Sequence, residues 1–354
     1  MEKIYKKSRF QSTIIYGETF ASQIKHNSTN GKHIFLITNQ RYYDLFSEKL
    51  VQLFENKQAL DWYICKNDAR CNNLNELENL LAFLADFNLQ EEYLFLGVGN
   101  EGVIQLTNFL HQSAVLKSTC WLLPLSIRSF SKSLIGSAQI ELKNRPVLQI
   151  PVLAEKIIYD RTLTTDQGEG KLVDFLVFIR CGLVSSHEFL RMLFKNYSTQ
   201  TRLNQQSFNG MLDEMIRYYE QSGNEIDQFG KLFEQGFSES VNGSLLSSHM
   251  KRLLGCLLQL LWSQEKNQFS FHYKNFIIWL IRLGFPVDFP EQILVSDYVE
   301  GVLKCIDRGQ TALCLKEIGE IDSIQLPTTE ELLMTVEKYK TTLLEIRGHI
   351  NDNV

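Results

Sequence analysis

The sequence predicts an α/β domain built on a parallel sheet in residues 1–165, followed by an all-helical domain in residues 166–354. Short apolar runs alternate with amphipathic helical patterns over the first 160 residues. Beyond that point the strand patterns stop, and helical patterns continue almost to the end of the chain. The polar, glycine-containing stretch at 161–171 separates the two regions and suits a domain boundary, and 354 residues are enough for two domains.

The first domain opens with short apolar runs rich in β-branched and aromatic residues. They predict buried strands at residues 31–39, 59–65 and 91–99. Apolar residues at helical spacing between these runs predict helices at 41–57 and 73–88. Two more strand candidates follow at 118–125 and 155–160. The alternation of strand and helix implies parallel pairing with right-handed crossovers.

The second domain consists of segments in which apolar residues recur at spacings of three and four. These spacings predict amphipathic helices at 172–184, 187–197, 210–221, 249–262, 275–285 and 329–346. A cleft between the two domains is the expected place for a ligand.

Composition excludes several classes of protein. The chain has 36 Lys and Arg against 41 Asp and Glu, and no long run of like charge, so we expect no nucleic acid and no membrane surface as partner. The longest apolar stretches are about half of a membrane span, and the N-terminus lacks the apolar core of a signal peptide. Seven cysteines without a CxxC pair predict reduced, buried thiols in a cytoplasmic protein.

Several segments resemble, in the same order, those of one enzyme family. They are GVGNEGV at 97–103, PLSIRSFSKSLIGSA at 124–138, the Lys143 and Asn144 pair, the stretch 160–184, FGKLFEQGF at 229–237 and ALCLKEIG at 312–319. This order is similar to that of the dehydroquinate synthase family, which belongs to the sugar phosphate cyclases and shares its fold with glycerol dehydrogenases. The resemblance implies a Rossmann-like first domain and a helical domain that carries the metal. It also implies a homodimer, because family members commonly dimerise.

The family's metal site is degraded in this sequence. In the family one Glu and two His hold a divalent metal, usually zinc, and the matching positions are Val177, Lys231 and His249. One imidazole cannot replace three ligands, and the lysine brings positive charge to the place of a cation. We expect no zinc, with His249 as a vestigial ligand.

The positions that match the family's catalytic residues have also changed. An acidic residue is replaced by Val103, an Asp by Lys132, a Lys by Ala138, and a His by Gln235. A further Lys becomes Arg180, which keeps the charge but changes the hydrogen-bond geometry. The resemblance therefore implies a site without its catalytic groups.

The cofactor site is less clearly lost. The matching positions are Asn39, Gly97, Gly99, Gly102, Lys143 and Asn144. A glycine turn after a strand can bring backbone N–H groups to the pyrophosphate of NAD, but Val98 replaces the middle glycine of the family's triplet. A tight strand-to-helix turn without a ligand is the preferred interpretation, so we expect no resident cofactor and keep NAD as the alternative.

Two functional hypotheses remain. The first is a catalytically inactive pseudoenzyme that binds a partner protein, such as an active enzyme of the family, or a small ligand. The alternative is an active sugar phosphate cyclase or an NAD-dependent oxidoreductase with an altered active site.

Overall fold

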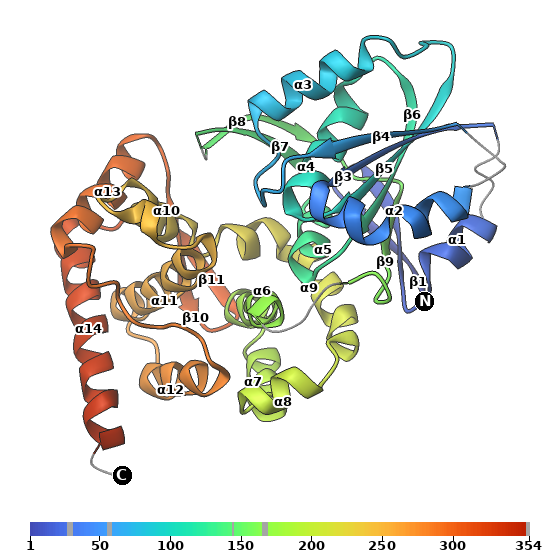
Figure 1. Cartoon of the computed structure of the whole chain (residues 1–354). Coiled ribbons are helices and arrows are strands. Elements are labelled where there is room, and N and C mark those ends of the chain that lie inside the picture. Colours follow the sequence, from blue (N-terminus) through green and yellow to red (C-terminus); the bar gives the residue numbers. More distant parts are fainter. Residues whose placement is uncertain (27–30, 55–58, 144, 165–168, 352–354) are drawn as a thin grey trace. The chain divides into compact units, whose positions relative to one another are not determined.

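The computed structural model describes residues 1–351 except 27–30, 55–58, 144 and 165–168 (Figure 1). The chain divides into two compact units, Met1–Asp166 and Gln167–Val354. None of the helices in the described part is long and apolar enough to cross a membrane.

The first unit contains nine strands and five helices among its described residues. The strands are β1 (Glu2–Lys7), β2 (Phe10–Tyr16), β3 (His33–Asn39), β4 (Leu60–Cys65), β5 (Glu92–Gly99), β6 (Lys117–Pro124), β7 (Ser137–Leu142), β8 (Arg145–Pro151) and β9 (Lys156–Tyr159). The helices are α1 (Phe20–His26), α2 (Gln40–Phe54), α3 (Leu74–Leu84), α4 (Glu101–Ser113) and α5 (Ile127–Ser133).

A seven-stranded sheet forms the centre of this unit, in the order β1-β2-β9-β6-β5-β3-β4. All neighbouring pairs except β1 and β2 are parallel, so the predicted parallel sheet is confirmed, with one antiparallel edge strand added. The strand order reverses between β3 and β5, because β3 is followed by β4 on one side and β5 by β6 on the other. A reversal of this kind opens a crevice at the carboxyl ends of the strands.

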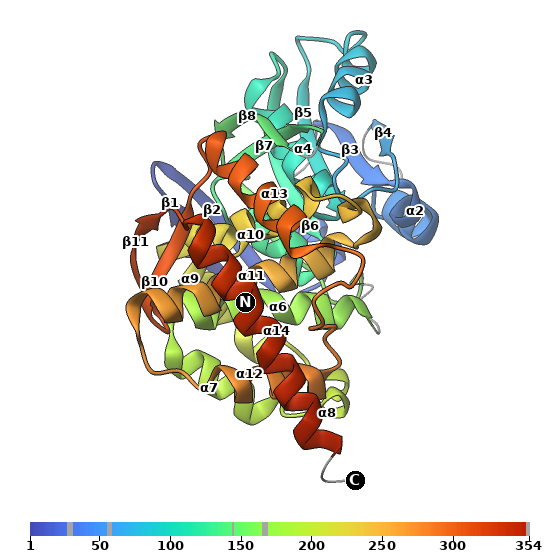
Figure 2. The same cartoon turned by 90° about the vertical axis from the view of Figure 1, so that its left-hand side faces the viewer.

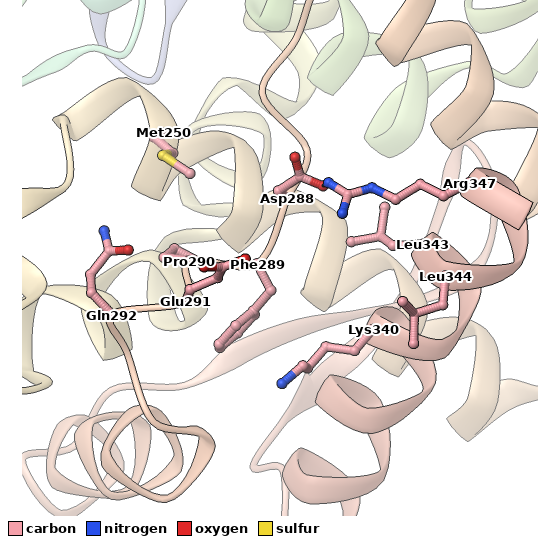
Figure 3. A pocket seen from close by; sticks show the side chains of 10 residues that line it. All are labelled: Met250, Asp288, Phe289, Pro290, Glu291, Gln292, Lys340, Leu343, Leu344 and Arg347. Carbon is pink, nitrogen blue, oxygen red and sulfur yellow. The ribbon is translucent and has the colours of Figure 1, made fainter. Parts of the chain in front are cut away.

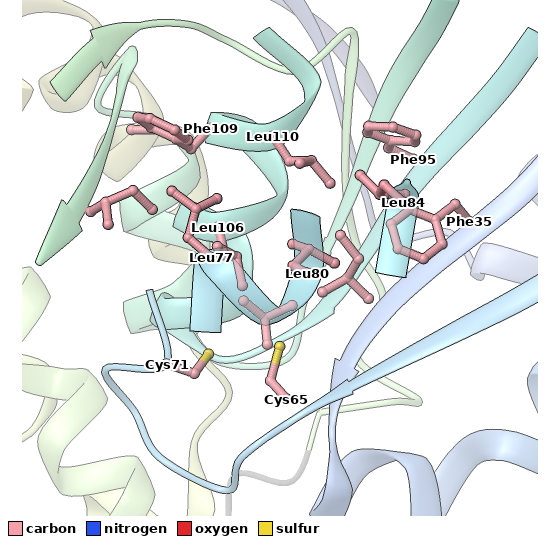
Figure 4. Close-up of a cluster of buried hydrophobic side chains, with 14 of the residues drawn as sticks. Phe35, Cys65, Cys71, Leu77, Leu80, Leu84, Phe95, Leu106, Phe109 and Leu110 are labelled. Atoms are coloured by element: carbon pink, nitrogen blue, oxygen red, sulfur yellow. The ribbon is translucent and has the colours of Figure 1, made fainter. Parts of the chain in front are cut away.

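The sheet buries apolar residues on both faces, because successive side chains of a strand point to opposite sides. Phe35 and Ile37 of β3 join one apolar cluster with α3 and α4 (Figure 4), whereas Ile34 and Leu36 join a second cluster on the other face. The separate hairpin of β7 and β8 covers the first cluster with Ile140. The near-continuous apolar pattern of the central strands is therefore explained by burial from both sides.

The second unit is mainly helical. Its helices are α6 (Glu169–Ser185), α7 (His187–Asn196), α8 (Gln200–Gln205), α9 (Asn209–Gln228), α10 (Lys231–Glu239), the 3-10 turn η1 (Gly243–Leu245), α11 (Ser248–Asn267), α12 (Tyr273–Leu283), α13 (Val295–Asp307) and α14 (Thr329–Asn351). The six predicted helices are all present, and α14 packs against α11 and α13 (Figure 2).

The expectation of an all-helical second domain is wrong in one respect. An antiparallel hairpin joins β10 (Ala312–Glu317) to β11 (Glu320–Gln325), with Gly319 at a positive φ of 90° in its turn. β10 lies against α11, where the side-chain amide of Gln259 donates to the Leu313 carbonyl at 2.7 Å. The helix thus satisfies a backbone group of a hairpin too short to be stable alone.

Glycines allow three helices of the second unit to approach closely. A Cβ at Gly255 of α11 would lie 2.4 Å from the Gly230 carbonyl oxygen, at the start of α10. On the other side, a Cβ at Gly301 of α13 would lie 2.4 Å from the Gly236 carbonyl oxygen of α10. Helix α10 is therefore held between α11 and α13, and this fixes the side chains described below.

All seven cysteines are free and buried, which confirms the expectation of buried thiols without a disulfide. The cytoplasmic location remains a prediction.

Candidate functional site

The first candidate region lies at the carboxyl ends of β3 and β5, where the strand order reverses. Asn39 ends β3 and Gly99 ends β5, and α4 begins two residues after Gly99. Asn100 caps this helix, because its side-chain oxygen accepts a hydrogen bond from the backbone N–H of Val103 at 3.1 Å. This is the place where a dinucleotide would meet a helix N-terminus in a nucleotide-binding sheet.

A loop of the chain itself, residues 66–72, lies against this region. The side-chain amide of Asn39 donates to the Lys66 carbonyl at 2.8 Å, and that of Asn100 donates to the Asp68 carbonyl at 3.0 Å. The side-chain oxygen of Asn39 is buried and has no hydrogen-bond partner among the residues that the structure describes. Asn39 and Asn100 therefore tether the loop, and the side-chain oxygen of Asn39 remains an unused hydrogen-bond acceptor.

The three glycines of the turn are explained by packing inside the protein. A Cβ at Gly97 would lie 2.6 Å from Thr107 Oγ1, and one at Gly99 would lie 3.0 Å from Val103. A Cβ at Gly102 would lie 2.7 Å from the backbone nitrogen of Cys71 in the loop. The turn therefore does not by itself indicate a nucleotide.

Two further predicted positions lie outside this turn. Lys143 is exposed between β7 and β8, and Asn144 lies outside the described residues. A carboxylate also stands in the first turn of α4, where Glu101 pairs with Arg128 at 3.6 Å. A negative group at this end of the helix competes with a phosphate for the same favourable field.

Two of the three first-unit positions that match the family's catalytic residues carry apolar side chains. Val103 and Ala138 are fully buried in the same apolar cluster as Leu106. Lys132 lies in the last turn of α5, and its carbonyl accepts a long hydrogen bond of 3.5 Å from the Gln105 amide. Two of the three positions are thus part of the hydrophobic core.

In the second unit, the positions that match metal ligands do not form a metal site. Val177 is buried in α6, Lys231 is the first residue of α10, and His249 is exposed at the second position of α11. Helix α11 turns Gly255 toward α10, and six residues of helix place His249 about 120° away from that face. Over the described residues, no three His, Cys, Asp or Glu side chains are grouped as metal ligands, so the side chains present do not fit zinc.

A buried network of ion pairs connects the helices that carry these positions. Arg252 of α11 donates to Glu234 Oε2 of α10 at 2.6 Å and to the backbone carbonyl of Asp227 in α9. The Asp227 carboxylate lies 3.8 Å from Arg252 and 3.9 Å from Arg180 of α6. Arg180 also donates to the hydroxyl of Tyr219 at 3.4 Å. We refer to Arg180, Asp227, Glu234 and Arg252 as the ion network.

The carboxylates of the ion network raise the pKa of its arginine on α11. Burial by itself lowers the pKa of Arg252, but the carboxylates of Glu234 and Asp227 more than offset this, so the pKa lies above the ordinary value. Within the described part of the chain, the Nε of Arg180 and the side-chain oxygen of Gln235 are buried without a hydrogen-bond partner. Arg180 and Arg252 thus pair with two carboxylates, while one donor atom of Arg180 and the acceptor atom of the nearby Gln235 are not used.

Sequence reasoning predicted Arg180 and Gln235 as altered positions but missed Asp227, Glu234 and Arg252. The available signal was limited to two carboxylates, Asp227 and Glu234, at buried positions of amphipathic helices, whereas Arg252 is only half-buried.

A surface pocket of about 410 Å³ lies elsewhere in the second unit, near α14 (Figure 3). Figure 3 shows Asp288 and Arg347 pointing toward each other, and their charged atoms are 2.6 Å apart. Lys340 lies over the ring of Phe289. None of the predicted site residues lines this pocket, so it is not the degraded site.

The fold and a weak sequence similarity agree on one group of proteins. No family model matches the chain. The 3-dehydroquinate synthase of Bacillus pumilus is 19% identical over 330 residues, which cover 87% of this chain and 88% of that protein.

Solved structures give a stronger match in fold. A 2-deoxy-scyllo-inosose synthase complexed with carbaglucose-6-phosphate, NAD+ and Co2+ superposes with a TM-score of 0.78 over 96% of this chain and 99% of the other, at 10% identity. The 2-epi-5-epi-valiolone synthase of Streptomyces hygroscopicus subsp. jinggangensis, with NAD+ and Zn2+ bound, has a TM-score of 0.76 over 95% and 99%, also at 10% identity. The chain therefore has the fold of the dehydroquinate synthase-like sugar phosphate cyclases, as the resemblance implied.

Proposed function

We propose that this protein is a dehydroquinate synthase-like pseudoenzyme that has lost metal-dependent cyclisation and acts by binding. The observation that carries the proposal is the ion network in the second unit. The helices α6, α10 and α11 hold the positions that match the family's metal ligands, and in this chain buried arginine–carboxylate pairs link those helices to one another and to α9.

The charges of the second unit oppose a divalent cation. Lys231 occupies one of the positions that match the family's metal ligands. Arg252 extends to α10 and α9 from α11, the helix that also carries His249 at another of these positions. A metal bound beside these groups would face like charges, while the carboxylates of Asp227 and Glu234 already neutralise the arginines. The ion network ties the helices together by hydrogen bonds that require no metal.

The first unit supports the same proposal. The family's acidic and lysine positions, Val103 and Ala138, are packed in the core, where no side chain can transfer a proton. Oxidation and elimination on a sugar phosphate need groups that accept and return protons. The chain has replaced them with groups that stabilise the fold.

The small-ligand form of the proposal centres on the unused acceptor of Asn39. This oxygen lies at the strand reversal, and two solved structures with this fold contain NAD+. We propose NAD+ as the first ligand to test. In the other form of the proposal, the protein binds a second copy of this chain or an active cyclase. This form rests on the resemblance, because family members commonly dimerise.

The decisive experiment combines substrate, cofactor and metal. The protein is incubated with the heptulosonate phosphate of dehydroquinate synthases, NAD+ and Zn2+ or Co2+, and released phosphate is measured beside an active 3-dehydroquinate synthase. The proposal predicts no release above a control without protein, and no NADH fluorescence.

Phosphate release that requires added metal and disappears in His249→Ala would establish the alternative, an active cyclase with an altered site. NADH formation without phosphate release would establish an oxidoreductase. Either result would overturn the pseudoenzyme proposal. A parallel calorimetric titration with NAD+ separates the two binding forms, because heat saturating at one NAD+ per chain supports the small-ligand form.

A further inference from the structure

Two cysteines lie together at the carboxyl edge of the sheet. Cys65 is the last residue of β4, and Cys71 lies near the end of the tethered loop 66–72. Both are free, and their exposed fractions are 1% and 0%. Figure 4 shows their sulfur atoms turned toward the same apolar cluster.

The two cysteines belong to the same buried apolar cluster. Asn39, which pairs with Cys65 across β3 and β4, also places its amide 3.8 Å from the Cys71 sulfur. Asn39 therefore neighbours Cys65 through the pairing of their strands and Cys71 through its side-chain amide.

We propose that Cys65 and Cys71 form a reversible disulfide that reshapes the loop at the strand reversal. Hydrogen peroxide is the oxidant. One thiol gives up its proton, and the resulting thiolate attacks a peroxide oxygen. The O–O bond breaks, the sulfur becomes a sulfenic acid, and the departing hydroxide takes up that proton and leaves as water. The second thiol then displaces the hydroxyl group as a second water, and the S–S bond forms. A dithiol reductant returns both thiols by disulfide exchange.

Disulfide formation has a structural consequence for the glycine turn. A disulfide bond of about 2 Å is shorter than any thiol contact, so Cys71 must move toward β4. Cys71 also packs against Gly102, where a Cβ would lie 2.8 Å from its sulfur. Moving Cys71 therefore changes the support of the first turn of α4, which the same loop contacts through Asn100.

Access of the oxidant depends on opening of the loop. The neighbouring Cys71 side chain and burial both raise the pKa of the Cys65 thiol, so the closed loop holds it protonated and unreactive. The tether from Asn100 to the Asp68 carbonyl keeps the loop closed. Weakening this tether increases the open fraction and the rate of oxidation.

Tryptic peptide mapping under non-reducing conditions tests the proposal directly. Lys66 and Arg70 lie between the two cysteines, so trypsin separates Cys65 from Cys71 unless a disulfide joins them. After treatment of the folded protein with hydrogen peroxide, we expect the joined pair of peptides, which a dithiol then separates. The other cysteines, also buried, are internal controls: Cys120, Cys181, Cys256, Cys305 and Cys314.

A matched pair of variants tests the gating by the loop. Asn100→Asp keeps the oxygen that caps α4 but removes the amide that donates to Asp68, and we expect about five-fold faster disulfide formation. Asn88→Asp, at the other end of β5, likewise keeps an acceptor for a backbone N–H and loses an amide donor, and should leave the rate unchanged. Far-ultraviolet circular dichroism confirms that each variant is folded.

The proposal fails if the folded protein yields no joined Cys65 and Cys71 peptides, or if all seven cysteines link indiscriminately. Equal rates in Asn100→Asp and Asn88→Asp would overturn the role of the loop. Since the readout is a covalent bond, these outcomes do not depend on whether the protein has enzymatic activity.

Discussion

Replacing Arg252 by methionine tests the ion network most sharply. Methionine keeps the unbranched shape of the buried stem but removes the guanidinium that donates to Glu234 and to the Asp227 carbonyl. The side chain of Glu234 is 11% exposed and that of Asp227 13%, so both carboxylates would lose a cation while remaining largely buried. The variant therefore removes the cation that pairs with both carboxylates in the interior.

The expected loss of stability follows from this burial. Removing one partner of a buried ion pair costs about 3–5 kcal/mol. In a unit the size of Gln167–Val354, each kcal/mol lowers the melting temperature by about 2–4 °C, so we expect Arg252→Met to melt roughly 6–20 °C below the parent. The double variant Arg252→Met/Glu234→Gln also removes the charge of the Glu234 carboxylate. Its melting temperature should therefore be higher than that of the single variant.

Differential scanning calorimetry measures these shifts, and an exposed ion pair supplies the control. Arg217 bonds to Glu214 on the surface of α9, so Arg217→Met should lower stability by no more than about 1 kcal/mol. If Arg252→Met melts within 2 °C of Arg217→Met, or if the double variant is less stable than Arg252→Met, the ion network does not replace the metal as a link between these helices.

Two further predictions concern the other altered positions. Val177→Glu places a carboxylate at a buried site, where losing the valine costs about 1.5 kcal/mol and an unpaired buried charge costs several more. The melting temperature should therefore fall, and added zinc should not restore it. An unchanged melting temperature that rises by several degrees with zinc would show an open, polar site. Gly102→Ala should lower the melting temperature, because the added Cβ would lie 2.7 Å from the Cys71 backbone nitrogen. Gly210→Ala is the control and should be neutral or slightly stabilising, because its added Cβ would meet no neighbouring atom within 4 Å. Equal melting temperatures of the two variants would contradict the packing of the loop.

The sequence predicted those parts of the fold that depend on local patterns. The central strands, such as β3 and β5, are buried on both faces and therefore read as continuous apolar runs. The β1–β2 hairpin was missed because its first strand is rich in lysine and forms a solvated edge. The β10–β11 hairpin was missed because it depends on packing against α11.

The positions that match the family's site residues could be located from the sequence, but their surroundings could not. Motif positions identified Val177 and Lys231 as unsuited to a metal, and the structure places them on helices without a converging ligand set in the described residues. The ion network was not predictable, because Asp227, Glu234 and Arg252 lie on three different helices, α9, α10 and α11, that meet only in the folded unit. Sequence spacing alone cannot reveal contacts made by different helices.

The metal content of the purified protein shows whether the second unit still holds a divalent cation. The protein is purified without chelator, dialysed against one equivalent of Zn2+ or Co2+, and analysed by plasma mass spectrometry together with its His249→Ala variant. We expect well under one equivalent of bound metal and no difference between the two proteins, because Val177, Lys231 and the exposed His249 do not supply a set of metal ligands. One tightly bound equivalent that is lost in His249→Ala would contradict it.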